Sequence, residues 1–147
     1  MAIFKLPPKE QTGTPKDGIL DSQNASEAEA AADLARAFPM MVCGDVQTMR
    51  LALNEARGLY EPQRAQYIQS RLLPLAQKLK NQGTIFGYPL VTDVAAHLHN
   101  FISQHSIYDK KELDIVYNDV LMLQNILWKR ISGDGGKVGR EILAQLI

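Results

Sequence analysis

Residues 76–87 decide the fold class of this chain, and they read Ala76-Gln77-Lys78-Leu79-Lys80-Asn81-Gln82-Gly83-Thr84-Ile85-Phe86-Gly87. At about 100° per residue, their apolar members continue an apolar helix face that begins several turns earlier. We expect that face to be buried, and its members are Ala65, Ile68, Leu72, Leu75, Ala76, Leu79, Gly83 and Phe86. Gln77 lies nearly opposite, so the spacing predicts a solvent-exposed Gln77 surrounded by Gln66, Ser70, Leu73, Lys80, Asn81 and Thr84.

The segments on either side of this stretch also carry helical signals. Pro62 suits the first turn of the helix that bears the apolar face, and we expect this helix to run to about Phe86. The next helix has Pro89 in its first turn, and a further one covers roughly residues 111–131, where apolar residues recur at helical spacing. The glycines of residues 133–136 interrupt that pattern, so we expect a turn there and a short last helix after it.

The N-terminal part of the chain predicts an arm and two further helices. Residues 1–25 are rich in Pro, Lys, Gly, Asp, Gln and Ser without an apolar period, and we expect an irregular arm. Residues 26–29, Ser-Glu-Ala-Glu, match a capping box that marks a helix start. Pro39 should stop that helix, and Asp45 should cap the next one, which ends near Gly58.

The predicted fold is therefore all-α. We expect residues 26–147 to form one domain, an up-down four-helix bundle with additional short N- and C-terminal helices. No segment shows convincing strand alternation or an internal repeat.

The spacing within residues 76–87 resembles the signature of histidine-containing phosphotransfer (HPt) domains, the helical bundles that carry phosphate between receiver domains in bacterial phosphorelays. The residues in register with that signature are Ala76, Leu79, Lys80, Gly83, Phe86 and Gly87. The resemblance extends over roughly residues 63–102, because the family uses apolar positions on the next helix that correspond to Val91, Val94, Ala95 and Leu98. It implies a bundle whose phosphate-accepting residue stands on an exposed helix face.

This chain departs from the HPt signature at two positions that serve the reaction. Gln77 replaces the phosphate-accepting histidine, and an amide nitrogen conjugated with its carbonyl is not a useful nucleophile. Asn81 stands where the family has glycine, and its side chain should crowd an approaching receiver. Lys80 remains, at a position that helps to balance phosphate charge in the family. The resemblance thus implies a pseudo-phosphotransfer domain that binds protein without transferring phosphate.

The expected partner is a receiver domain or a histidine kinase. The expected binding surface consists of Gln66, Ser70, Leu73, Gln77, Lys80, Asn81 and Thr84. Pro74 lies inside the same helix and removes a hydrogen bond there, so it either displaces this surface or bends the helix over a curved core. We expect no enzymatic activity, catalytic residue, cofactor or metal.

Two alternatives belong to other classes of function. The chain could transfer phosphate through another histidine, for which His97 is the least poor choice; His99 points away from the apolar face and His105 lies near a helix end. Since His97 and His99 are two residues apart, they do not share a helix face as a metal site requires.

The second alternative is a helical scaffold protein, which could form a homodimer through its terminal helices. Residues 128–130, Trp-Lys-Arg, are a second candidate contact surface, although basic residues are common at helix C-termini.

The composition fits this interpretation. The 147 residues suffice for one domain, and 46% of them are hydrophobic while 22% are charged. Sixteen basic residues balance sixteen acidic ones, so no field of one sign favours nucleic acid or an anionic membrane. The single cysteine, Cys43, allows no internal disulfide. Because no signal-peptide core or long apolar run occurs, we expect a cytoplasmic protein without membrane contact.

Overall fold

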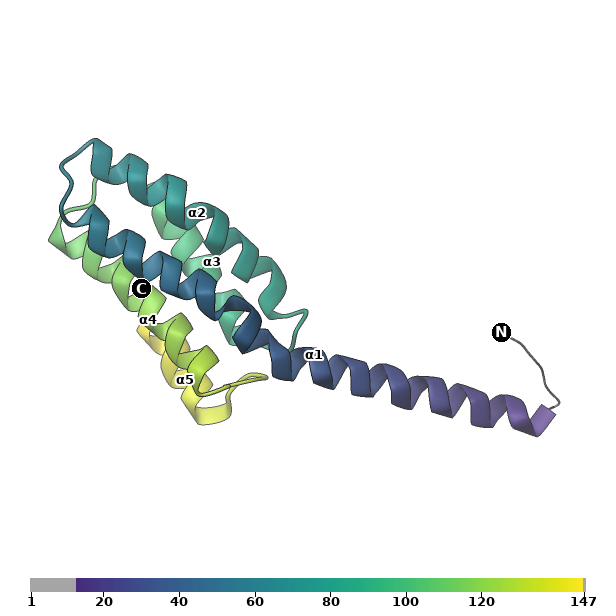
Figure 1. The fold of residues 1–147 in the computed structure, drawn as a ribbon. Coiled ribbons are helices and arrows are strands. Elements are labelled where there is room, and N and C mark those ends of the chain that lie inside the picture. The colour runs from purple at the N-terminus through teal and green to yellow at the C-terminus, as the bar shows by residue number, and fades with distance from the viewer. Residues whose placement is uncertain (1–12, 147) are drawn as a thin grey trace. The chain divides into compact units, whose positions relative to one another are not determined.

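The computed structural model describes the backbone of residues 13–146 and the side chains of residues 26–146. Five α-helices follow one another over this range, and the described residues contain no strand (Figure 1). Their bounds are α1 Gly13–Ala56, α2 Gln63–Gly83, α3 Pro89–Gln104, α4 Lys110–Trp128 and α5 Gly136–Gln145. The predicted all-α class is confirmed for this part of the chain.

The chain divides into two compact units by its internal contacts. The N-terminal unit comprises residues 1–36 and the C-terminal unit residues 37–147. Within the N-terminal unit, the described residues from Gly13 onward are helical, and every described side chain except that of Ala35 is exposed. None of the helices in the described range combines the length and the apolar character that crossing a bilayer demands.

Most of the boundaries predicted for the N-terminal half are wrong, although α1 ends at Ala56, close to the expected helix end near Gly58. Residues 13–25 are helical instead of irregular, and residues 1–12 of the expected arm lie outside the described residues. The capping box of residues 26–29 lies inside α1, which also continues through Pro39. Proline costs a helix about 3 kcal/mol. Here Pro39 is buried, and it sits between the core residues Phe38 and Val42, so tertiary packing offsets the lost hydrogen bond.

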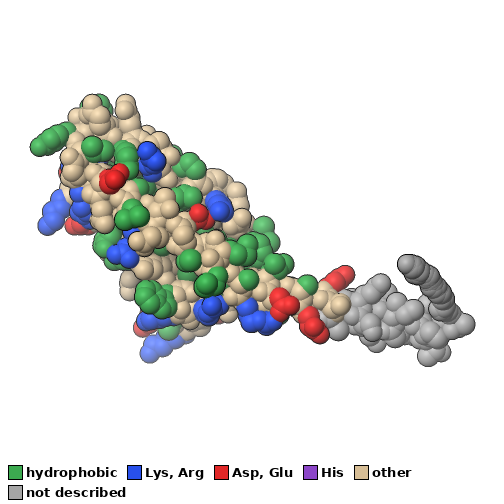
Figure 2. All heavy atoms as spheres, viewed as in Figure 1, with side chains coloured by type: hydrophobic (Ala, Val, Ile, Leu, Met, Phe, Trp, Pro, Cys, Tyr) green, Lys and Arg blue, Asp and Glu red, His purple; other side chains and the backbone are tan. Residues whose placement is uncertain are grey.

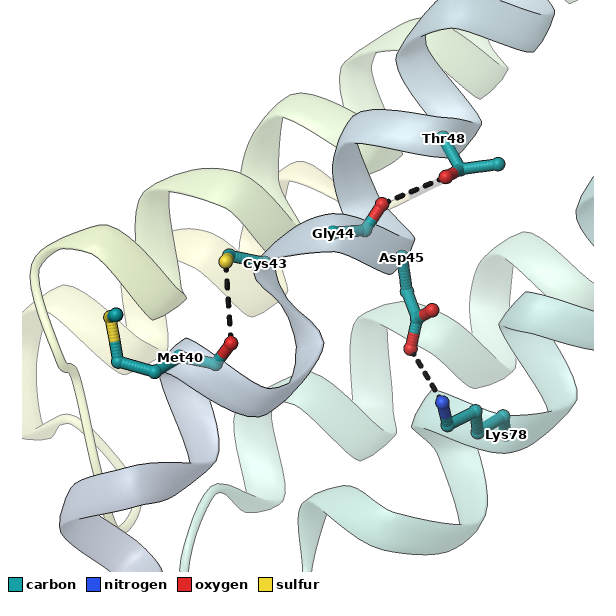
Figure 3. A network of polar contacts seen from close by, with 6 residues as sticks. All are labelled: Met40, Cys43, Gly44, Asp45, Thr48 and Lys78. Atoms are coloured by element: carbon teal, nitrogen blue, oxygen red, sulfur yellow. Dashed lines mark hydrogen bonds and ion pairs between the residues drawn. The ribbon is translucent and has the colours of Figure 1, made fainter.

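Asp45 caps no helix, because α1 is continuous at that position. Its carboxylate instead pairs with the Lys78 ammonium at 2.8 Å and links α1 to α2 (Figure 3). Around it, α1 also carries two internal side-chain bonds: the Thr48 hydroxyl donates to the Gly44 carbonyl at 2.8 Å, and the Cys43 thiol to the Met40 carbonyl at 3.3 Å.

The later helices agree better with the sequence pattern. α2 begins one residue after Pro62 and α3 begins at Pro89, as predicted. However, α2 ends at Gly83 instead of Phe86, and α4 ends at Trp128 instead of near residue 131. A turn that contains left-handed backbone at Gly133, Gly135 and Gly136 then leads into the short α5.

In the C-terminal unit, consecutive helices from the second part of α1 to α4 run in opposite directions, and α5 packs against α3 (Figure 1). One apolar core joins them all, with Phe38, Met49, Leu72, Leu98 and Leu123 among its fully buried members.

The two ends of the C-terminal unit are held differently. At one end, Phe38 stacks on Phe86 with ring centroids 5.0 Å apart and lies 5.4 Å from the ring of Tyr88. At the other end, polar groups tie the α1–α2 loop and the first turn of α2 to the α3–α4 loop. The Glu61 carboxylate accepts from the Tyr108 backbone N–H at 2.6 Å, and the Arg64 guanidinium donates to the Tyr108 carbonyl at 2.6 Å.

Candidate functional site

The helix that carries the candidate site presents the predicted apolar face to the core. Six of its eight expected members are buried, namely Ala65, Ile68, Leu72, Ala76, Leu79 and Gly83. Leu75 and Phe86 are half-buried and pack against the core. The 3.6-residue period therefore predicted the orientation of α2 correctly.

The expected binding surface lies on the outer side of α2, with graded exposure. Gln66, Ser70, Asn81 and Thr84 are exposed, whereas Leu73, Gln77 and Lys80 are half-buried. The expectation that Gln77 is exposed to solvent is thus too strong, because it stands at the border of the buried face. Its amide Nε2 donates to the Asn81 Oδ1 at 3.1 Å, as residues four apart on a helix can do.

This amide pair defines what position 77 can do chemically. The Gln77 nitrogen already donates to Asn81, and a carboxamide offers hydrogen bonds without a nucleophilic lone pair. The side chains at the two departures from the HPt signature, Gln77 and Asn81, therefore contact each other. The surface can recognise polar groups of a partner, with Lys80 as its cationic member.

A close contact at the end of α2 positions this surface. A Cβ atom at Gly83 would lie 2.6 Å from the Thr92 hydroxyl, 2.7 Å from the Thr92 nitrogen and 2.8 Å from the Tyr88 carbonyl oxygen. The start of α3 thus fits against a residue without a side chain. Gly87, in the same turn, has a φ of 87°, a conformation that favours glycine.

Thr92 completes the junction, although no sequence motif predicts this role. Its hydroxyl donates to the Lys80 carbonyl at 3.0 Å and accepts from the Thr84 N–H at 2.8 Å. The Lys80 carbonyl belongs to the last turn of α2, where backbone acceptors lack helical partners. Thr92 therefore satisfies the end of α2 and fixes the backbone directly beneath the candidate surface.

His97 forms a different kind of arrangement. Its Nδ1 lies 2.5 Å from the Asp119 Oδ2, and this pair connects α3 to α4. A cavity of about 440 Å³ adjoins the pair and is also lined by Asn118, Asn125 and Gln145. Burial raises the pKa of Asp119, while its hydrogen bond with His97 acts in the opposite direction. The partner Asp119 was not foreseen, because one acidic residue within an amphipathic helix gives no distinctive signal.

The other two histidines, His99 and His105, lie on α3 or directly after it. His105 stacks on Phe101 with centroids 3.9 Å apart, and its Nδ1 lies 2.7 Å from the Phe101 carbonyl oxygen. His99 is half-buried on α3. Over the part of the chain that the structure describes, no group of three or more His, Cys, Asp or Glu side chains is arranged to hold a metal ion.

Comparison with protein-family models gives no match for this chain. Comparisons with curated proteins and with solved structures give no match either. The function proposed below therefore depends on the geometry of the described residues and on the resemblance of residues 76–87 to the HPt signature.

Proposed function

We propose that this chain is an HPt-like four-helix bundle that binds a receiver domain or a histidine kinase of a two-component system and does not transfer phosphate. The observation that carries the proposal is the pairing of Gln77 with Asn81 on the outer side of α2. The position that accepts phosphate in the family carries an amide here, and that amide is held by the residue that replaces the family's glycine.

The residues that match the HPt signature have structural roles that support this proposal. Ala76 and Leu79 belong to the core. Gly83 admits α3 at close range, and Gly87 adopts left-handed backbone in the connecting turn. The chain thus keeps the residues that build the site and lacks the nucleophile that would use it. We expect this combination in a module that binds a partner without transferring phosphate.

The proposed docking surface combines amide, hydroxyl, ammonium and apolar groups. Its members are Gln66, Ser70, Leu73, Gln77, Lys80, Asn81 and Thr84. Leu73 is half-buried and packs against the core, so it supplies a rigid apolar contact within a polar surround. By covering the docking face of a receiver, the module would sequester that receiver without accepting its phosphate.

The first experiment measures binding of the purified chain to the receiver domains encoded in the same genome, by isothermal titration calorimetry. We expect one receiver to bind saturably, and Gln77→Arg to weaken that binding at least tenfold without changing the unfolding transition. Asn100→Arg is the matched control, because Asn100 is exposed, lies on α3 and is not a member of the proposed surface. Equal affinities of the two variants would remove the surface from consideration.

A second experiment restores the missing chemistry. The double variant Gln77→His/Asn81→Gly supplies an imidazole and removes the side chain that contacts position 77. With a phosphorylated receiver, we expect this variant to acquire an acid-labile phosphate, while the wild type acquires none. Phosphate on the wild-type chain, lost in His97→Gln, would instead establish transfer through His97.

A further inference from the structure

An apolar groove lies between α1 and the end of α4, on a different part of the C-terminal unit from the proposed receiver surface. We call it the α1/α4 groove; it has a volume of about 730 Å³ and is lined by Pro39, Met40 and Cys43 of α1 and by Leu127 and Trp128 of α4. Trp128 is 78% exposed and Met40 is 70% exposed. Large apolar side chains gathered around a groove mark an interaction site, and tryptophan is enriched among residues that dominate binding energy.

The rim of the groove is basic. Among the lining residues that the structure describes, Arg130 carries a charge and no carboxylate is present, while Lys129 is its exposed neighbour. The Arg50 guanidinium donates to the side chain of Gln124, another lining residue, at 3.2 Å. Figure 2 shows hydrophobic side chains interspersed with Lys and Arg on the face where α1 and α4 are in front. This groove fits an amphipathic helix with acidic residues.

The chain itself contains such a helix. Residues 26–36, which we call the acidic segment, belong to α1 and carry Glu27, Glu29 and Asp33 against one basic residue, Arg36, which pairs with Asp33. Its largest apolar side chain, Leu34, is 50% exposed and lies one turn after Ala30 on the same side. Apart from Ala35, every side chain of the segment is exposed. A helix without tertiary packing is marginal in water, so this segment gains stability by docking.

We propose that the acidic segment of each chain docks into the α1/α4 groove of a second copy, which gives a reciprocal homodimer. Leu34 supplies the apolar anchor for the groove, and the carboxylate of Glu27, seven residues earlier on the same helix face, faces the cations of its rim. Exchange of the same segment in both directions closes the assembly with twofold symmetry and leaves no groove open. This inference does not depend on the proposed receiver binding, because the groove and the α2 surface share no residue.

The first test uses the full chain and measures mass by light scattering over a range of concentrations. Because Trp128 is the single tryptophan, its emission reports directly on the groove. We expect a concentration-dependent dimer mass together with a blue shift of the emission. Leu34→Asp and Trp128→Ala should each move the dimerisation midpoint at least tenfold higher, while Ile107→Ala, a matched control at a 64% exposed residue, leaves it unchanged. A monomer at every concentration, or a dimer insensitive to Leu34→Asp, overturns the proposal.

The second test distinguishes a second copy from docking within one chain. Cys43 is the only cysteine, is exposed and lines the groove. A Leu34→Cys/Cys43→Ser chain is mixed with wild type under mild oxidation, and we expect a disulfide-linked pair that contains one copy of each chain. The single variant Leu34→Cys retains Cys43. Because positions 34 and 43 lie about 13.5 Å apart along an unbroken helix, a disulfide within its monomer requires α1 to break between them. Absence of a mixed pair overturns the homodimer proposal, and a disulfide within the monomer would then show that the segment folds back onto its own groove.

Discussion

Gly83→Ala tests the junction of α2 and α3 most directly. The added Cβ would lie 2.6–2.8 Å from three atoms, two of which are backbone atoms that cannot rotate away. Overpacking of this kind costs about 1–3 kcal/mol. Alanine is the better helix former by up to about 1 kcal/mol, but Gly83 is the last residue of α2, so little of that gain applies. We therefore expect a net loss of about 1–2 kcal/mol in the free energy of unfolding.

Urea unfolding followed by circular dichroism measures this loss as a fall in the midpoint of roughly 0.5–1 M. Gly44→Ala is the matched control, since Gly44 lies inside α1 and a Cβ there would meet no atom within 4 Å. That substitution should raise stability by about 0.5–1 kcal/mol through helix propensity alone. If Gly83→Ala is as stable as the wild type while Gly44→Ala behaves as expected, the close approach of α3 to Gly83 is refuted.

Three further predictions concern other parts of the C-terminal unit. Arg64→Met leaves the Tyr108 carbonyl without the Arg64 donor and should lower the free energy of unfolding by about 1–3 kcal/mol. Arg71→Met, the control at an exposed arginine of the same helix, should change it by less than about 0.5 kcal/mol. Equal effects of the two variants in thermal unfolding would contradict this prediction. The pKa of Asp119 in the folded state lies above its ordinary value of 3.8, because burial disfavours the charged carboxylate. The wild type should therefore lose stability relative to Asp119→Asn as the pH rises from 3.8 through the raised pKa. A difference in urea unfolding that does not depend on pH would refute this prediction. Pro74→Ala restores a backbone donor inside α2 at an exposed residue and should raise the melting temperature; a lower one would mean that the core requires the proline bend.

The sequence predicted those parts of the fold in which local signals and packing agree. On α2 and α3, Pro62 and Pro89 stand at helix starts and the apolar residues keep one period, so both helices begin where expected. α1 shows the opposite case. Pro39 and Asp45 are typical of helix ends, but burial of Pro39 in the core and the Asp45–Lys78 ion pair outweigh those local preferences. Propensity gives no information about a contact with a residue more than thirty positions away.

The candidate surface was predictable in orientation and not in detail. Periodicity placed Gln77 and Asn81 on the outer side of α2, but it did not predict the half-burial of Gln77. Nor did it identify Thr92, whose hydroxyl acts on the end of another helix. The partner of His97 was also missed, since Asp119 lies 22 residues further along the chain and becomes its neighbour through the packing of α3 on α4.

The bonds from Glu61 and Arg64 to Tyr108 have a consequence for the order of folding. They join residues 47 and 44 positions apart, one on the α1–α2 side and one in the α3–α4 loop. A contact between residues so far apart in the sequence forms only after the chain has lost the conformational entropy of closing a long loop. These bonds therefore form after each neighbouring pair of helices has assembled. Loss of Arg64 should then mainly accelerate unfolding and leave the refolding rate nearly unchanged. The polar end of the unit would thus set how long the folded state persists.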